Sequence, residues 1–179
     1  MKIVVEKIGN VCFKKISKKE AELLCDDILS LINIIPHLNN DKDDLFEERN
    51  PKYSKWEHSI CAYNETMEII GILLAYYIES DDKHDMSSLY IHRLAIKKEY
   101  QKHGIGKQLL SYFLKTSFET IPYLNTISIQ TNQEYDNQYV IDFYHSMGFI
   151  DKYTIQYPDK LDILMIITRE KYTFKKYYM

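Results

Sequence analysis

The chain has 179 residues, of which 45% are hydrophobic and 27% charged, proportions typical of a globular domain rather than a disordered chain. Its formal net charge of −3 excludes a whole-molecule field that would attract nucleic acid, and no apolar run reaches the roughly 18 residues of a membrane span. We therefore expect one domain over residues 1–179 that binds neither nucleic acid nor membrane.

The N-terminal third is expected to contain short strands followed by a helix. Residues 2–15 suit one or two strands. Ser17 followed three residues later by Glu20 forms a capping box, and apolar residues recur behind it at helical spacing, so a helix is expected to run until just before Pro36. Residues 39–55 are polar and acidic and predict a loop or a short exposed helix. The apolar residues of the helix are Leu23, Leu24, Ile28, Leu31 and Ile32.

The middle of the chain is expected to form three strands. Residues 69–78 are a nearly continuous apolar run, as in a central strand that is buried on both faces. Residues 56–63 are predicted to pair with this run as a hairpin around a turn at residues 64–66. A solvated turn at residues 81–85 then leads to a strand over residues 88–96.

The C-terminal half alternates helices and strands. A strand, a helix and a strand across residues 88–130 form a crossover, which makes two strands parallel. The expected fold class is therefore α/β (α+β), with a mixed, mainly antiparallel sheet of about seven strands flanked by helices. The expected elements are a helix over 104–118, a strand over 126–130, a helix over 137–147 ended by Gly148, a hairpin of 149–157 with 161–168 around residues 158–159, and a frayed or surface-packed tail over 171–179.

The segment between the strand at 88–96 and the following helix is predicted to bind a phosphate group. The first amides of a helix have no internal partners and carry partial positive charge, so an anion fits there. Glycines let the backbone approach the phosphate oxygens, and basic side chains add positive charge. The residues of this turn are Gln101, Lys102, His103, Gly104, Ile105, Gly106 and Lys107.

Other glycine-loop motifs fit this segment less well. In a P-loop, Gln101 would stand at the first glycine and Gln108 at the Ser or Thr. In the dinucleotide-binding pattern, Leu109 would stand at the third glycine. Taken alone, the segment also fits a glycine-containing helix start that binds nothing.

Two motifs resemble those of the GNAT superfamily of N-acetyltransferases. Its acetyl-CoA-binding motif is Arg or Gln, two variable residues, Gly, one variable residue, and Gly or Ala, which Gln101 to Gly106 match. Its second signature is a helix that begins near an Asn and ends in aromatic-Tyr, three residues and Gly-Phe, which Asn137 and residues 143–149 match. The resemblance is clearest over residues 88–150. It implies a GNAT-like fold with a splayed parallel strand pair, and an acetyl-CoA-dependent N-acetyltransferase.

The resemblance also implies how the cofactor would be bound. The backbone of Leu94, Ala95 and Ile96 would hold the pantetheine arm and the acetyl carbonyl. The amides from Gln101 to Lys107 would hold the pyrophosphate, and Asn137 would bind the cofactor arm.

Acetyl transfer to an amine also needs a proton donor and a proton acceptor. Tyr144 matches the frequent general acid of the family, which protonates the departing thiolate and lies against the cofactor; the alternative is a core tyrosine. His92 is the first candidate for the general base, because histidine titrates near neutral pH, although a structural histidine fits as well. Glu79 is the second candidate for the same task.

The acceptor is expected to be an amine of a small molecule or a peptide. The acidic residues of 41–48 lie where the family often builds its acceptor wall and could favour a cationic amine, although charge runs usually face water and a solvated loop is the preferred interpretation. Two alternatives stay open for the whole chain: a catalytically silent CoA-binding sensor of the same fold, and an interaction domain suggested by the sixteen tyrosines and the aromatic tail.

The cysteines indicate the compartment. Cys12, Cys25 and Cys61 are odd in number and lack metal-ligand spacing, so we expect neither a disulfide framework nor a metal site. An early Glu6 interrupts the apolar core that a signal peptide would need. We expect a cytoplasmic protein, and exposed edge strands make a homodimer reasonable.

Overall fold

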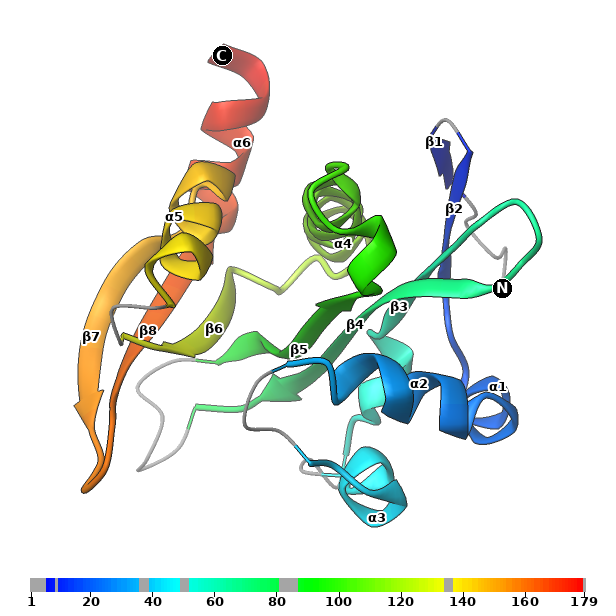
Figure 1. Ribbon diagram of the computed structural model, residues 1–179. Helices are drawn as coiled ribbons and strands as arrows, with labels where there is room; N and C mark the ends of the chain where they lie inside the picture. The colour runs from blue at the N-terminus through cyan, green and yellow to red at the C-terminus, as the bar shows by residue number, and fades with distance from the viewer. Residues whose placement is uncertain are drawn as a thin grey trace. The chain divides into compact units, whose positions relative to one another are not determined.

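The computed structural model describes residues 6–8, 10–35, 39–48, 52–80, 87–133 and 137–178 (Figure 1). Within these ranges the strands form one eight-stranded sheet in the order β1-β2-β3-β4-β5-β6-β8-β7, which confirms the predicted mixed sheet flanked by helices. The strands are β1 (Glu6–Ile8), β2 (Val11–Lys15), β3 (Ile60–Tyr63), β4 (Ile69–Ile78), β5 (Ser88–Ile96), β6 (Thr126–Asn132), β7 (Ile150–Gln156) and β8 (Leu161–Thr168). The helices are α1 (Lys18–Leu23), α2 (Cys25–Ile32), α3 (Lys42–Phe46), α4 (Ile105–Thr120), α5 (Gln138–Met147) and α6 (Arg169–Tyr178), with 3-10 helices η1 (Lys55–Glu57) and η2 (Lys98–Tyr100).

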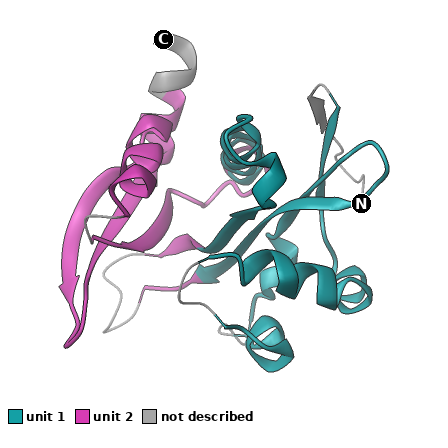
Figure 2. Ribbon diagram, viewed as in Figure 1, with its two compact units in different colours: residues 1–77, 92–117 teal, residues 78–91, 118–179 magenta. Residues whose placement is uncertain are grey.

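The chain divides into two compact units (Figure 2). Unit 1 comprises residues 1–77 and 92–117, and unit 2 comprises residues 78–91 and 118–179. The expectation of a single domain stays a prediction. The helical segment ends at Ile32, before Pro36 as expected, whereas the expected turn at residues 81–85 lies outside the described residues.

The antiparallel strands of unit 1 follow the predicted hairpin. β3 pairs with β4, and the Asn64 side-chain oxygen accepts hydrogen bonds from the backbone amides of Thr66 (3.1 Å) and Glu68 (2.9 Å) in the turn. The prediction that β3 begins at Trp56 is wrong. The Ser54 hydroxyl caps the 3-10 helix η1 by accepting from the Trp56 amide at 3.4 Å, so the chain becomes extended only at residue 60.

The predicted first helix is two helices. Its capping box is confirmed, because the Ser17 hydroxyl accepts from the Glu20 amide and the Glu20 carboxylate accepts from the Ser17 amide. The helix ends at Leu23, and α2 begins again at Cys25. Leu23 was expected on the apolar face but is 78% exposed, because the break at Leu24 shifts the buried face to the residues of α2. The buried residues of α2 are Cys25, Ile28, Leu31 and Ile32.

The helices of unit 1 cover both faces of its strands (Figure 1). One face packs against α1, α2 and α3 in a core that includes Ile28, Leu45, Ile72 and Ala95. The other face packs against α4, where the Phe13 and Tyr112 rings stack with centroids 5.6 Å apart. Successive residues of β5 therefore face different helices.

Unit 2 contains the predicted parallel strand pair. Residues 89–91 of β5 pair in parallel with residues 127–129 of β6, and both strands continue beyond the paired residues. β6 and β7 flank β8, antiparallel to it. Gly148 ends α5 with φ +99°, as its place after the helix predicted.

Of the two expectations for the tail, frayed or packed on the surface, the structure agrees with the second. The tail forms α6, whose Tyr172 ring packs on the Phe118 ring with centroids 5.2 Å apart.

Candidate functional site

The predicted phosphate turn joins β5 to α4 within unit 1. The Lys97 amide donates to the Ile70 carbonyl at 2.9 Å and fixes the end of β5 to β4. The Gln101 side chain then folds back, so that its amide nitrogen donates to the Ile96 carbonyl at 2.9 Å. The Gln101 backbone amide is also occupied, because it donates to the Lys98 carbonyl at 3.2 Å. Gln101 therefore braces the turn from within.

Left-handed backbone shapes the turn. Gly104 has φ +80° and Lys102 has φ +61°, both in the region that glycine favours. A Cβ atom added at Gly104 would meet no atom within 4 Å, so the backbone conformation, and not lack of space, calls for glycine there. A Cβ atom at Gly106 would lie 3.6 Å from Ile96 Cγ1, an ordinary contact, which fits a motif that accepts Gly or Ala.

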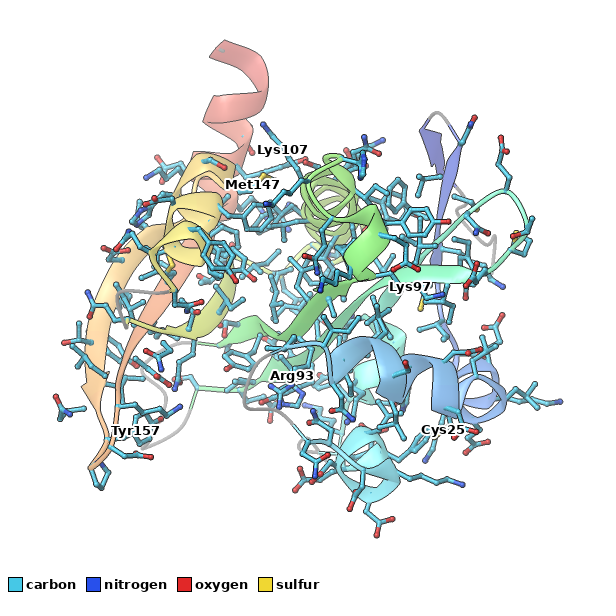
Figure 3. All side chains as sticks on the ribbon, in the orientation of Figure 1. Cys25, Arg93, Lys97, Lys107, Met147 and Tyr157 are labelled. Atoms are coloured by element: carbon cyan, nitrogen blue, oxygen red, sulfur yellow. The ribbon has the colours of Figure 1, made fainter. Side chains whose placement is uncertain are left out.

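The turn presents a row of backbone amides that donate to no backbone carbonyl of the described residues. Within the part of the chain that the structure describes, the backbone amides of residues 102–107 have no backbone acceptor, and the first helical bond runs from Gln108 to the Gly104 carbonyl at 3.0 Å. The Lys102, His103 and Lys107 side chains are exposed around them (Lys107 is labelled in Figure 3). Free amides, the helix dipole and two lysines make this turn a suitable anion site.

The end of β5 packs closely on β4 and α4. Ala95 is 5% exposed in the core with α1–α3, whereas Leu94 and Ile96 are half-buried. A Cβ atom at Gly71 of β4 would lie 2.6 Å from Ile96 Cδ1, so a larger residue at this position would force the end of the Ile96 side chain to move. Gly71 was not among the predicted site residues; the signal for it in the sequence is a glycine inside an apolar strand.

His92 lies on β5, on the same face as Ile96, because two and four residues along a strand share a face. Its ring is half-buried and meets the Tyr76 ring edge-on, with centroids 5.6 Å apart. The next residue, Arg93, points to the opposite face, where its Nη2 donates to the Asn40 side-chain oxygen at 3.4 Å (Figure 3). The α4 face of β5 thus carries His92, Leu94 and Ile96.

Tyr144 lies in unit 2, in the last turn of α5. It is 4% exposed and meets the Phe143 and Phe149 rings at centroid distances of 5.1 and 5.5 Å. Burial, and to a smaller degree the nearby Tyr90, raise the pKa of the Tyr144 phenol well above its usual value. Tyr144 therefore keeps its proton at neutral pH, as a general acid must.

Asn137 also lies in unit 2, at the start of α5. Its side-chain nitrogen donates to the Thr131 hydroxyl (2.9 Å) and to the Asn132 carbonyl (2.7 Å) at the end of β6. It makes no side-chain cap to its own helix. Asn137 thus ties α5 to the end of β6.

The remaining predicted residues are more scattered. Glu79 is an exposed residue of unit 2 immediately after β4. In the acidic segment, Asp41 and Asp44 form the capping box of α3, and Glu48 accepts from the Ser54 hydroxyl (2.7 Å) and the Lys55 amide (3.0 Å). These carboxylates shape the local backbone.

The structure gathers the predicted residues in two sets. Unit 1 holds His92, residues 94–96 and residues 101–107 on one continuous strand–turn–helix segment. Unit 2 holds Glu79, Asn137 and Tyr144.

The described residues form neither a metal-binding cluster nor a membrane-spanning helix. Among them, no three His, Cys, Asp or Glu side chains gather as a metal site would require. None of the helices in those ranges is both long and apolar enough to cross a membrane.

Solved structures share this fold at low sequence identity. The ribosomal-protein-S18-alanine N-acetyltransferase from Escherichia coli matches with TM-score 0.69 and 12% identity over 88% of this chain and 93% of that chain. NAA60 of Arabidopsis thaliana in complex with acetyl-CoA matches with TM-score 0.68 and 19% identity over 88% and 99%. A variant of the spermidine N-acetyltransferase SpeG from Vibrio cholerae matches with TM-score 0.64 and 15% identity over 94% and 99%.

The sequence itself matches a family model. The model of the acetyltransferase (GNAT) family covers residues 26–149, which include the phosphate turn and the helix with Tyr144. This is more than half of the chain, and the fold is that of the enzymes above. The chain belongs to the acetyltransferase (GNAT) family.

Proposed function

We propose that the chain is an N-acetyltransferase that uses acetyl-CoA to acetylate a primary amine of a small molecule or peptide. The observation that carries the proposal is the row of backbone amides at residues 102–107, aligned with the start of α4 and flanked by lysines. This arrangement fits a pyrophosphate. Related folds crystallised with acetyl-CoA, or named for alanine and spermidine N-acetylation, support the choice of donor and acceptor class.

The residues of this chain divide the work. The backbone of Leu94, Ala95 and Ile96 would hold the pantetheine arm and acetyl carbonyl, and Asn137 the cofactor arm. Transfer forms an N–C bond, breaks the C–S bond, and releases one proton from the amine while the thiolate gains one. Tyr144 donates the proton to sulfur, and His92 accepts the amine proton, with Glu79 as the alternative acceptor.

The turn can be tested with two matched glycine variants. Gly104→Ala forces a side chain into left-handed backbone, so we expect acetyl-CoA to bind about tenfold more weakly by calorimetry. Gly106→Ala adds its methyl group at ordinary contact distance and should keep most of the affinity. Equal affinities for both variants and the native chain would show that the turn does not hold the cofactor.

Turnover needs a separate assay. Free thiol release from acetyl-CoA should rise with at least one member of a broad amine panel. Binding of acetyl-CoA with no turnover across that panel would select a CoA-binding sensor, and no binding at all would overturn the proposal.

A further inference from the structure

The end of the β7–β8 hairpin holds an ammonium group between a carboxylate and an aromatic face. Lys160 Nζ lies 2.9 Å from Asp162 Oδ2 and 4.9 Å from the centroid of the Tyr157 ring. The Asp162 side chain is 4% exposed, whereas the Lys160 side chain is 42% exposed. The Asp162 carboxylate is therefore buried in the folded domain, whereas the Lys160 ammonium group approaches it from the solvent side. Tyr157 is labelled in Figure 3.

Gln130 fixes the Asp162 carboxylate, one oxygen of which has no hydrogen-bond partner among the described residues. Gln130 Nε2 donates to Asp162 Oδ2 at 2.6 Å and to the Tyr157 hydroxyl at 3.0 Å, which fixes both side chains. Asp162 Oδ1 is buried and has no hydrogen-bond partner. A buried carboxylate oxygen without a donor costs free energy, so the ammonium group at Oδ2 is important for stabilising the Asp162 charge.

The site lies at the carboxyl end of β6. Gln130 follows Ile129, the last residue of β6 that pairs with β5, and Asn132 lies opposite Asp162 in the β6–β8 ladder. Asn137 binds the same end of β6 through Thr131 and Asn132. Residues 130–132 at the end of β6 therefore contact both the ammonium site, through Gln130, and Asn137, which is proposed to hold the cofactor arm.

We propose that Asp162, Tyr157 and Gln130 form a recognition site for an ammonium group of the acceptor, and that Lys160 is a tethered occupant which the acceptor displaces. The proposal rests on the proposed acetyl transfer and names its substrate class, an aliphatic diamine or polyamine. The amine that is acetylated must be neutral, so a carboxylate site suits a second, charged amino group of the same molecule. That second group is bound through the transfer and keeps its proton.

Binding is tested on the full chain by calorimetry with 1,4-diaminobutane, with the uncharged 1,4-butanediol as the control ligand. Lys160→Ala removes the competing ammonium and should tighten diamine binding about tenfold. Lys171→Ala removes an equal charge from exposed α6, at the far end of β8, and should bind as the native chain does. Equal affinity in both variants would overturn the proposal, and this comparison needs no change to a buried residue.

Asp162→Asn provides the opposite change. It keeps the shape of the side chain, removes its charge, and should weaken diamine binding about tenfold or more, provided that its circular dichroism matches the native chain. Retained diamine affinity in a folded Asp162→Asn variant would also overturn the proposal.

Activity separates this inference from the proposed function. With 1,4-diaminobutane, Asp162→Asn should raise KM about tenfold and change kcat little, whereas kcat/KM for butylamine should stay near the native value. If butylamine and the diamine lose activity equally, the site does not select diamines. If no amine is acetylated by any variant, acetyl transfer fails as the function, and the order of diamine affinities alone decides the ammonium site.

Discussion

At the scale of single residues, the proposed chemistry depends most on the environment of Tyr144. Aromatic rings surround the phenol, and burial raises its pKa, so the phenol stays protonated at neutral pH. A protonated phenol can donate a hydrogen bond to the thiolate that leaves the thioester and so stabilise it.

The matching prediction concerns Tyr144→Phe. This change keeps the ring contacts with Phe143 and Phe149 and removes the proton donor, so kcat should fall about 10²-fold while acetyl-CoA affinity stays near the native value. Steady-state kinetics and calorimetry measure the two quantities. An unchanged kcat would remove Tyr144 as the acid.

The burial of His58 should make the folded protein less stable in mild acid. Burial, with the charge of Lys15 as a lesser cause, lowers the pKa of His58 from 6.5 to about 4. The unfolded chain therefore binds a proton below pH 6.5 that the folded chain refuses until about pH 4, and acid favours unfolding in this window. From pH 7.5 to 5 the free energy of unfolding should fall by about 2 kcal/mol through this group.

Urea unfolding at the two pH values checks the His58 prediction. The His58→Gln variant should lose about 2 kcal/mol less than the native chain between pH 7.5 and 5. Glu20 contributes little in this pH range. A hydrogen bond from Lys14 lowers the pKa of Glu20 from 4.5 to about 2, so protonation of this carboxylate reduces the free energy of unfolding mainly below pH 4.5. The same pH sensitivity in both proteins would contradict the prediction.

At the scale of elements, the sequence predicted those helices and strands whose ends are set by residues next to them in the chain. β4 and β5 match their predicted ranges, since the nearly continuous apolar run of β4 ends before Glu79 and β5 ends before Lys97. Gly148 marks the end of α5. The break at Leu24 was missed because the apolar spacing continues across it. α6 was missed because its anchors, Phe118 and the carbonyls of residues 118–124, lie about 50 residues away in sequence.

In the candidate site too, only the features that depend on neighbouring residues in the chain were predicted from the sequence. The turn at residues 101–107 was found from its glycines, since left-handed backbone leaves a trace in the sequence. The brace from Gln101 to Ile96 and the carboxylate of Asp162 were missed, because each depends on which carbonyl or amide the fold brings to it.

Arg169 is the anchor of α6 and of the end of α4. Its guanidinium donates to the Phe118, Ile121 and Leu124 carbonyls, which end α4 and the loop behind it. Arg169→Lys cannot reach all three with one ammonium, so the free energy of unfolding should fall by about 2 kcal/mol. Urea unfolding of this variant and of Lys171→Ala, which changes an exposed charge on the same helix, measures the difference. Equal losses in the free energy of unfolding would show that the hydrogen bonds of the Arg169 guanidinium add no stability beyond that of its charge.

At the scale of the whole molecule, the path of the chain bears on the expectation of one domain. The chain leaves unit 1 at the end of β4 and returns in the middle of β5, so residues 88–91 belong to unit 2 and residues 92–96 to unit 1. α4 is divided in the same way at residue 117. A strand or helix that belongs to both units resists melting in one unit alone, because its hydrogen bonds are cooperative.

We therefore propose that the two units unfold together. Trp56 is the one tryptophan of the chain and is 4% exposed in unit 1, so its fluorescence reports on that unit. Hydrogen exchange at the amides of β8 reports on unit 2. Urea titration should give the same midpoint for Trp56 fluorescence and for far-ultraviolet circular dichroism, and β8 amides should exchange only through global unfolding. Arg169→Lys should then lower the fluorescence midpoint of Trp56 although Arg169 lies in unit 2, whereas an unmoved midpoint would mean that the units fold as separate domains.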